Sequence, residues 1–378
     1  MKNFKSGQYK QQLAYKSFSP AVINRPFEIS DPEIILLLSE ANRLLGELNA
    51  YGNLIPDVDI FIHMHVAKES TTSNMIEGTQ TEINEALMDK KDISPEHIDD
   101  WLEVQSYTKA MNASIKALDK LPLSIRLLKD AHKILLINTR GKNKHPAEIR
   151  KSQNWIGGST PTDAFFVPPH HQELDDLLSD LEKFWHNQEI TVPHLIKAAI
   201  SHYQFETIHP FLDGNGRIGR LLITLYLVSE GLLSRPVLYL SDFFHRNRAS
   251  YYDSLTMVRK QNDLTQWLKF FLCGIIESSQ NGRRSFEEIV KLRAKCEKKI
   301  GTLGKRSPKG LDLLYFLFKH PTVDYKAVQK CLDFTHPSAN AMIKEFVRLK
   351  ILRETTGGKK NRLFEFFDYL NIFKRETL

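Results

Sequence analysis

The chain has 378 residues, of which 42% are hydrophobic and 26% are charged, and this is enough for two or three domains that each bury a core. The net charge of +7 equals the excess in one basic window, residues 283–310, so the rest of the chain is neutral overall. No apolar run approaches the roughly 18 to 20 residues of a membrane span, and no secretory signal is recognisable. Only three scattered cysteines are present, which excludes a disulfide framework and favours the cytoplasm.

Helical periodicity dominates the first third of the chain. Apolar residues recur three and four positions apart in four runs, which predicts a bundle of amphipathic helices. These runs cover residues 32–48, 66–76, 83–88 and 98–118. Gly78 follows the second run, where a glycine commonly ends a helix, so on spacing alone Glu77 is a solvated carboxylate at a helix end.

A different pattern occupies residues 154–169. Glycines and prolines surround short β-prone pieces here, which predicts a hairpin loop. Helical spacing resumes at Leu174 and continues through residues 195–205. No repeat or low-complexity tract is present, which excludes solenoid and propeller folds.

The stretch 209–220 reads His-Pro-Phe-Leu-Asp-Gly-Asn-Gly-Arg-Ile-Gly-Arg and runs directly into an apolar helical pattern. Gly214 and Gly216 allow the backbone to point several N–H groups into one concavity at a helix N-terminus, and such a place attracts anions. Arg217 and Arg220 lie three residues apart, on one helix face, where guanidinium groups match phosphate oxygens. The sequence therefore predicts a polyphosphate site.

Two further side chains in this stretch have suitable chemistry. Asp213 adjoins the glycines, and a carboxylate beside phosphates is the usual protein ligand of Mg²⁺. His209 carries an imidazole that titrates near neutral pH, as a general base requires. The glycine spacing that ends at Gly219 also fits a dinucleotide-binding fingerprint, but residues 195–205 before it have helical rather than strand spacing, and the missing Gly-Lys-Ser/Thr ending excludes a P-loop.

These twelve residues resemble the HPFx[D/E]GNGRxxR signature of the Fic family and match it at every fixed position. The resemblance implies a mostly α-helical Fic fold with a β-hairpin flap. It also implies transfer of AMP from ATP to a hydroxyl side chain of a protein, including the enzyme itself, with release of pyrophosphate and with Mg²⁺ as cofactor. In that scheme His209 deprotonates the hydroxyl, Asp213 holds Mg²⁺, Arg217 grips the phosphates and Arg220 reaches the γ-phosphate.

The same resemblance assigns the flap and the adenine pocket. Residues 150–157 and the hairpin that follows are similar to the Fic flap, which implies that target main chain adds to the flap edge near Phe166 and Val167 by β-augmentation. Asn247 and Tyr251 lie in a stretch similar to the family's adenine pocket, although aromatic residues at helical spacing are also typical of a core. The residues implied to bind ATP are Glu77, His209, Gly214, Asn215, Gly216, Arg217, Ile218, Gly219, Arg220, Asn247 and Tyr251.

Residues 73–78 are similar to the [S/T]xxxE[G/N] inhibitory motif of Fic proteins, with Ser73, Glu77 and Gly78 at its fixed positions. The resemblance implies that Glu77 pairs with Arg220 and so removes a phosphate donor. The added negative charge also disfavours a bound anion. Because the motif precedes the signature in the same chain, autoinhibition in cis is expected.

The last seventy residues follow the order helix, helix, helix, hairpin, which resembles a winged helix-turn-helix. Candidate contacts on its recognition helix and wing are Ser338, Asn340, Lys344, Arg348, Lys359, Lys360 and Arg362. Their charge and polarity suit DNA, and a dimerisation or docking module explains the pattern equally well.

Four parts are therefore expected along the chain. They are an N-terminal helical region with the inhibitory motif (1–110), a Fic catalytic core (111–281), a basic helix and linker (282–308) and a winged-helix domain (309–378). Fic relatives with this layout imply a homodimer. A Mg²⁺-dependent protein adenylyltransferase is the favoured function. Removal of AMP, another Fic phosphate transfer, and a DNA-binding regulator whose Fic site senses nucleotide are the alternatives.

Overall fold

The computed structural model describes residues 4–54, 58–356 and 362–374, and most of them are helical, so the predicted mostly α class is confirmed. Within these ranges, no helix is long and apolar enough to cross a membrane. The helices that precede the longest one are α1 (Pro32–Leu54), α2 (Val58–Ile76), α3 (Ile83–Ala86), α4 (Ile98–Leu118), α5 (Ile125–Leu136), α6 (Leu174–His186), α7 (His194–Ile208), α8 (Asn215–Ser229), α9 (Leu240–Arg246) and α10 (Arg248–Gln261).

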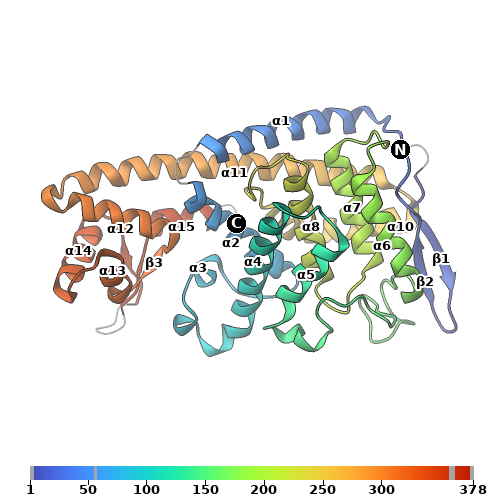
Figure 1. Ribbon diagram of the computed structural model, residues 1–378, viewed down its shortest axis with the longest axis horizontal. Helices are drawn as coiled ribbons and strands as arrows, with labels where there is room; N and C mark the ends of the chain where they lie inside the picture. Colours follow the sequence, from blue (N-terminus) through green and yellow to red (C-terminus); the bar gives the residue numbers. More distant parts are fainter. Residues whose placement is uncertain (1–3, 55–57, 357–361, 375–378) are drawn as a thin grey trace.

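Helix α11 (Leu264–Gly301) has 38 residues and runs beside α1 along the long axis of the molecule (Figure 1). At 1.5 Å per residue its length is about 57 Å. The composition changes near Gly282, but α11 continues through this position, so the expected boundary between residues 281 and 282 falls inside a helix. Gly282 is buried, and a Cβ there would lie 3.0 Å from Leu48 Cδ1, so the glycine permits close approach of α1.

Helices α7 and α8 form the centre of the molecule and are connected by the signature stretch. Nearly every side chain of α7 is buried, and so is most of α8, which contacts α4 and α5 on its other side. Because both helices are fixed by core packing on all faces, the short connection between them has a defined shape. The candidate site is therefore built on rigid elements.

A β-hairpin near the N-terminus was not predicted from the sequence. Strand β1 (Gly7–Gln11) pairs antiparallel with β2 (Lys16–Pro20) at the right-hand end of the molecule in Figure 1. Phe18 of β2 is buried and its ring lies 6.2 Å from that of Phe166. The predicted hairpin loop at 154–169 is present only as one antiparallel bridge between Ile156 and Phe166. The strand signal is weak because both segments are short and mostly polar.

The C-terminal module has the predicted order of three helices and a strand pair. These helices are α12 (Ser307–Lys319), α13 (Tyr325–Leu332) and α14 (His336–Arg348). Strands β3 (Thr322–Val323), β4 (Arg353–Glu354) and β5 (Phe364–Glu365) form a sheet in the order β3-β5-β4, and α15 (Phe367–Lys374) packs on α11. Lys359 and Lys360 lie outside the described residues, whereas Arg362 pairs with Glu354.

Candidate active site

The connection between α7 and α8 has a strained, tightly bonded backbone. His209 has a φ of 49° and Gly214 a φ of 75°, so both ends of the loop have a left-handed backbone, which is unfavourable for His209 and readily adopted by Gly214. Asn215, the first residue of α8, accepts a hydrogen bond from the Phe211 N–H through Oδ1 and donates one from Nδ2 to the Phe211 carbonyl, both at 2.8 Å. These bonds fix the loop that carries His209 and Asp213.

Two residues of the segment before the flap also support this loop. Arg150 donates from Nε to the His209 carbonyl at 3.0 Å, and Asn154 donates from Nδ2 to the carbonyls of His209 and Phe211 at 3.2 and 3.0 Å. Burial lowers the pKa of Arg150 to about 10. Arg150 and Asn154 therefore hold the loop that carries His209, a role that the sequence did not indicate.

His132 on α5 is a third support and was also missed. Its ring stacks on Phe211 with 3.8 Å between centroids, and its Nε2 lies 3.0 Å from the Asp213 carbonyl. The Ala147 N–H donates to Nδ1, so Nδ1 is unprotonated and the proton is on Nε2, which donates to the carbonyl. Burial lowers the pKa of His132 to about 4, which keeps the ring neutral. A single histidine in a helix carries no sequence signal for this role.

His209 is oriented as a general base. Its Nδ1 lies 3.3 Å from the Glu206 carbonyl oxygen, which can only accept, so the ring proton is on Nδ1 and the lone pair is on Nε2. Burial lowers the pKa of His209 to about 4, so the ring is neutral at physiological pH. The Nε2 of His209 has no hydrogen-bond partner among the described residues, and a neutral imidazole of this kind is able to take a proton from a hydroxyl group.

Arg220 is buried and is held by residues at the end of α2. Its Nη2 donates to Glu77 Oε1 at 2.6 Å and to the Ser73 carbonyl at 2.8 Å, and its Nε donates to Ser73 Oγ at 2.9 Å. A Cβ on Gly216 would lie 2.4 Å from Glu77 Oε1, so the glycine lets Glu77 lie directly over the first turn of α8. Burial by itself raises the pKa of Glu77, but the Arg220 guanidinium outweighs it and the pKa is lowered.

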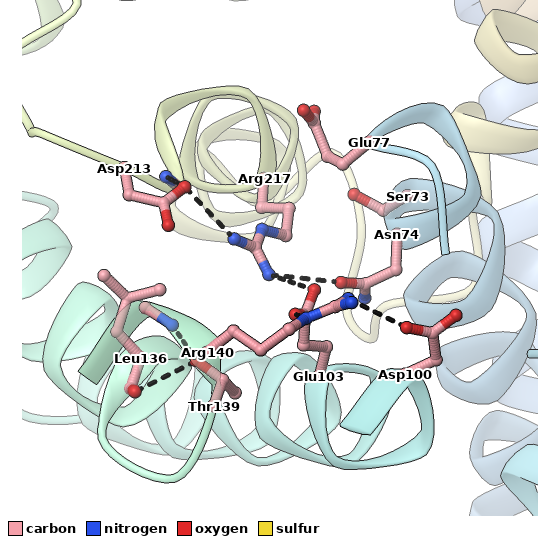
Figure 2. Close-up of polar contacts among 12 residues, drawn as sticks. Ser73, Asn74, Glu77, Asp100, Glu103, Leu136, Thr139, Arg140, Asp213 and Arg217 are labelled. Atoms are coloured by element: carbon pink, nitrogen blue, oxygen red, sulfur yellow. Dashed lines mark hydrogen bonds and ion pairs between the residues drawn. The ribbon is translucent and has the colours of Figure 1, made fainter. Parts of the chain in front are cut away.

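Arg217 lies in a second polar pocket, next to α4 (Figure 2). Its Nη1 donates to Glu103 Oε2 at 3.1 Å and to Asn74 Oδ1 at 3.4 Å, and its Nη2 lies 3.6 Å from Asp213 Oδ1. Each signature arginine therefore has a carboxylate partner from the N-terminal region. Glu103 was missed because nothing in a helical sequence distinguishes it from a surface glutamate.

Asp213 has an environment that fits a divalent cation. Its side chain is 40% exposed, and Oδ1 accepts from the Gly214 N–H at 2.6 Å. Gly141 leaves room beside Oδ2, where a Cβ would lie 3.0 Å away. The described part of the chain holds no cluster of three or more metal-ligating side chains, so Mg²⁺ at Asp213 would depend on phosphate oxygens and water for its other ligands.

Two family models match the chain over the elements that build this site. The Fic/DOC family N-terminal model matches residues 35–116, which include Glu77 and Glu103, and the Fic/DOC family model matches residues 122–227, which include both arginines. The chain belongs to the Fic family.

Similar Fic proteins are known from animals and bacteria. Protein adenylyltransferase fic-1 of Caenorhabditis elegans is 27% identical over 214 residues, which is 56% of this chain and 38% of that protein. Protein adenylyltransferase Fic of Aedes aegypti is 34% identical over 124 residues, which is 32% of this chain and 22% of that protein. The chain thus spans less than two fifths of the length of these curated relatives.

A crystal structure shows how far the Fic fold extends. The structure of a Fic family protein from Desulfovibrio desulfuricans G20 superposes with a TM-score of 0.57 at 20% sequence identity. The match covers 90% of this chain and 98% of that one, so the shared fold includes nearly all of the elements described above.

The Fic flap is more crowded than the sequence implied. Ile156 and Phe166 exchange both backbone hydrogen bonds, at 2.8 and 3.1 Å, and the Val167 carbonyl accepts from the Phe18 N–H at 2.9 Å. The backbone of Phe166 is thus paired on one side and the Val167 carbonyl on the other, and docking of a target near Phe166 and Val167 stays a prediction. Since alternate residues of a strand point their backbone groups to opposite sides, the outer edge of this pair lies along residues 155–157.

Tyr251 is a buried residue in this Fic protein, and its expected place in the adenine pocket stays a prediction. Its side chain is 1% exposed, its ring stacks on Phe244 and its hydroxyl lies 2.8 Å from His202 Nε2. Neighbouring residues of a helix point about 100° apart, so Tyr252, 39% exposed, is the ring that reaches the surface. Asn247 is half-buried between α9 and α10, and its Nδ2 donates to the Phe243 carbonyl.

Two other residues of the Fic signature serve packing. The side chain of Ile218 is completely buried and packs in the core, and the implied part of Ile218 in ATP binding stays a prediction. A Cβ on Gly219 would lie 2.1 Å from Glu206 Oε1, so this glycine makes room for a buried carboxyl group. Burial raises the pKa of Glu206 to about 7. The signature thus encodes helix packing as well as ligand contacts.

Proposed function

We propose that this chain is a Mg²⁺-dependent protein adenylyltransferase that transfers AMP from ATP to a hydroxyl side chain of a protein, itself included. The observation that carries the proposal is His209 with an unused Nε2, next to a helix start that holds two buried arginines. A base beside a cationic, anion-binding helix start suits attack of a hydroxyl on a phosphate. The curated relatives named above are called protein adenylyltransferases.

In the proposed reaction, His209 Nε2 takes the proton of the target hydroxyl while its oxygen attacks the α-phosphorus of ATP. A new P–O bond forms to the target, and the bond from the α-phosphorus to the bridging oxygen breaks, which releases pyrophosphate. Arg217 and Arg220 would bind the phosphates with forked N–H donors. Mg²⁺ held at Asp213 would neutralise phosphate charge.

Glu77 is proposed to inhibit this reaction. A phosphate must compete with the Glu77 carboxylate for Arg220, whose Nη2 is already 2.6 Å from Glu77 Oε1. Glu77 also places a negative charge at the start of α8, where the helix dipole favours an anion. Removing this carboxylate should therefore free the donor and the space together.

The protein target is proposed to dock on the flap. Exposed Trp155 and Phe165 flank the bridge, and the backbone edge at residues 155–157 suits β-augmentation by an extended segment. A cytoplasmic location and a homodimer stay predictions from the sequence. The three cysteines within the described ranges are free, which fits a reducing compartment.

The test is incubation with isotopically labelled ATP and Mg²⁺, followed by mass mapping of the products. Glu77→Gly should incorporate AMP into protein and release pyrophosphate, and the Glu77→Gly, His209→Ala double variant should incorporate none. Release of AMP from a modified protein without pyrophosphate would instead support the AMP-removing alternative. Equal incorporation by the wild type and Glu77→Gly would refute the proposed inhibition by Glu77.

A second candidate function is DNA contact by the C-terminal module. Lys305, Arg306 and Lys309 line a cavity of about 420 Å³ beside Ser338 at the start of α14. Lys344 and Arg348 are exposed on the same helix, so phosphate contacts are available along one face. An electrophoretic mobility shift of duplex DNA that weakens with added salt and with Lys305→Glu would support this function.

A further inference from the structure

Glu103 contacts two arginines from different parts of the chain (Figure 2). It lies in the second turn of α4, and its side chain is only 9% exposed. Oε2 accepts from Arg217 Nη1 at 3.1 Å, and Oε1 accepts from Arg140 Nε at 2.7 Å. Each carboxylate oxygen therefore has its own cationic partner.

Arg140 is itself fixed. It lies in a 3₁₀ turn after α5, and its Nη2 donates to Asp100 Oδ1 at 2.8 Å. Asp100 Oδ2 in turn accepts from the Gln80 N–H at 2.8 Å. The result is a chain of alternating charges, Arg217, Glu103, Arg140 and Asp100, that joins α8 to α4 and to the turn.

The contacts divide the donors of Arg217 into two groups. Nη1 is used by Glu103 and Asn74. Nη2 points to Asp213, and Nε is buried and has no hydrogen-bond partner among the described residues. One corner of the guanidinium is therefore fixed from the side of α4, and the other donors remain on the side of the signature loop.

We propose that Glu103 is a positioning residue that orients Arg217 for the phosphates of ATP, and that Arg140 holds Glu103 in place. The inference rests on the proposed nucleotide-binding function. Glu103 is not a second inhibitory residue, because it shares its charge with Arg140 and is fixed in the second turn of α4, on the side of Arg217 away from Asp213 (Figure 2). It would keep its contact with Arg217 when ATP binds.

The test is calorimetric titration of Mg²⁺·ATP into a Glu77→Gly, His209→Ala parent. This parent lacks the proposed inhibitory carboxylate and should not consume ATP. Adding Glu103→Ala should raise Kd roughly tenfold, because a hydrogen bond to a charged group is lost. Glu103→Gln should fall between the two, because its amide oxygen still accepts from one arginine. Arg140→Gln, at an exposed position where unfolding is not expected, should raise Kd about two- to fivefold.

Asp99→Asn is the matched control, since Asp99 is exposed in the first turn of the same helix and contacts neither Arg140 nor Arg217 among the described residues. Its Kd should equal that of the parent. Loss of structure alone would lower the binding stoichiometry and leave Kd unchanged, so Kd separates positioning from folding. If the parent binds ATP and Glu103→Ala binds it equally or more tightly, this inference is overturned while the proposed function stands. A parent that binds no ATP overturns both.

Discussion

The two arginine pockets have similar chemistry but hold their carboxylates in different ways. Glu77 follows the last residue of α2, its side chain is 35% exposed, and it precedes Gly78, which has a φ of 103° and open space around it. Glu103 lies within α4 and is bonded to two arginines. Under the proposed function, a phosphate would compete with a partly exposed carboxylate at a helix end in the first pocket, whereas the carboxylate of the second pocket is buried and paired with two arginines. An Arg–Glu ion pair is thus suited to inhibiting AMP transfer in the pocket of Arg220 and to orienting the guanidinium in the pocket of Arg217.

The strongest test of this difference is the sign of the effect on AMP transfer. Glu77→Gly should raise incorporation of labelled AMP roughly tenfold or more, because Arg220 regains a charge-assisted donor for phosphate. Glu103→Ala in the otherwise native chain should lower AMP incorporation below that of the wild type. An increase with Glu103→Ala would mean that both carboxylates compete with ATP.

The free energy of unfolding should show the second-largest difference between the two pockets. Glu103→Ala leaves Arg217 buried without its main partner, and breaking a buried ion pair in this way costs about 3 to 5 kcal/mol. Glu77→Gly should cost only roughly 1 kcal/mol, because Glu77 is partly solvated and Ser73 still bonds Arg220. Urea denaturation of both variants measures the difference. Equal losses would contradict the contrast between a movable and a fixed carboxylate.

The smallest expected effect is that of pH on the proposed inhibition by Glu77. The pKa of Glu77 is lowered, so its contact with Arg220 is complete above the ordinary glutamate range and is lost only as pH falls through a lower value. The pKa of His209 is about 4, so the base also stays neutral in mildly acidic buffer. The ratio of Glu77→Gly to wild-type activity should therefore be constant from about pH 7 to 5. A wild type that gains activity at the lower end would refute this assignment.

The sequence predicted those parts of the site that are contiguous in the chain. The loop from His209 to Arg220 is one contiguous motif, and the contact of Glu77 with Arg220 was implied because a second contiguous motif, at residues 73–78, also resembles a Fic motif. Glu103, Arg140 and His132 were not, because each is one ordinary residue that reaches the site only through folding. Their contacts span more than thirty residues of sequence, and no local spacing records them.

Helix phase and weak strand signals limit what else the sequence could predict. Tyr251 and Tyr252 are adjacent identical residues, and only core packing decides which one is buried. The β1–β2 hairpin was missed because its segments are short and largely polar. The fold class was more accessible, since helical periodicity is repeated in many independent segments and does not depend on any one of them.

The continuous helix α11 limits where the chain can be divided into folded fragments. Its first half packs in the Fic core, and its second half carries the buried side chains of Phe286, Ile289 and Ile300, of which Phe286 stacks on His65 of α2. A fragment that starts at residue 282 would begin in mid-helix and expose this apolar face to water. The better place to divide the chain is the turn after Gly301, where Gly304 has a φ of 59°. Even there, the released module would lose the helix on which α12 and α15 rest.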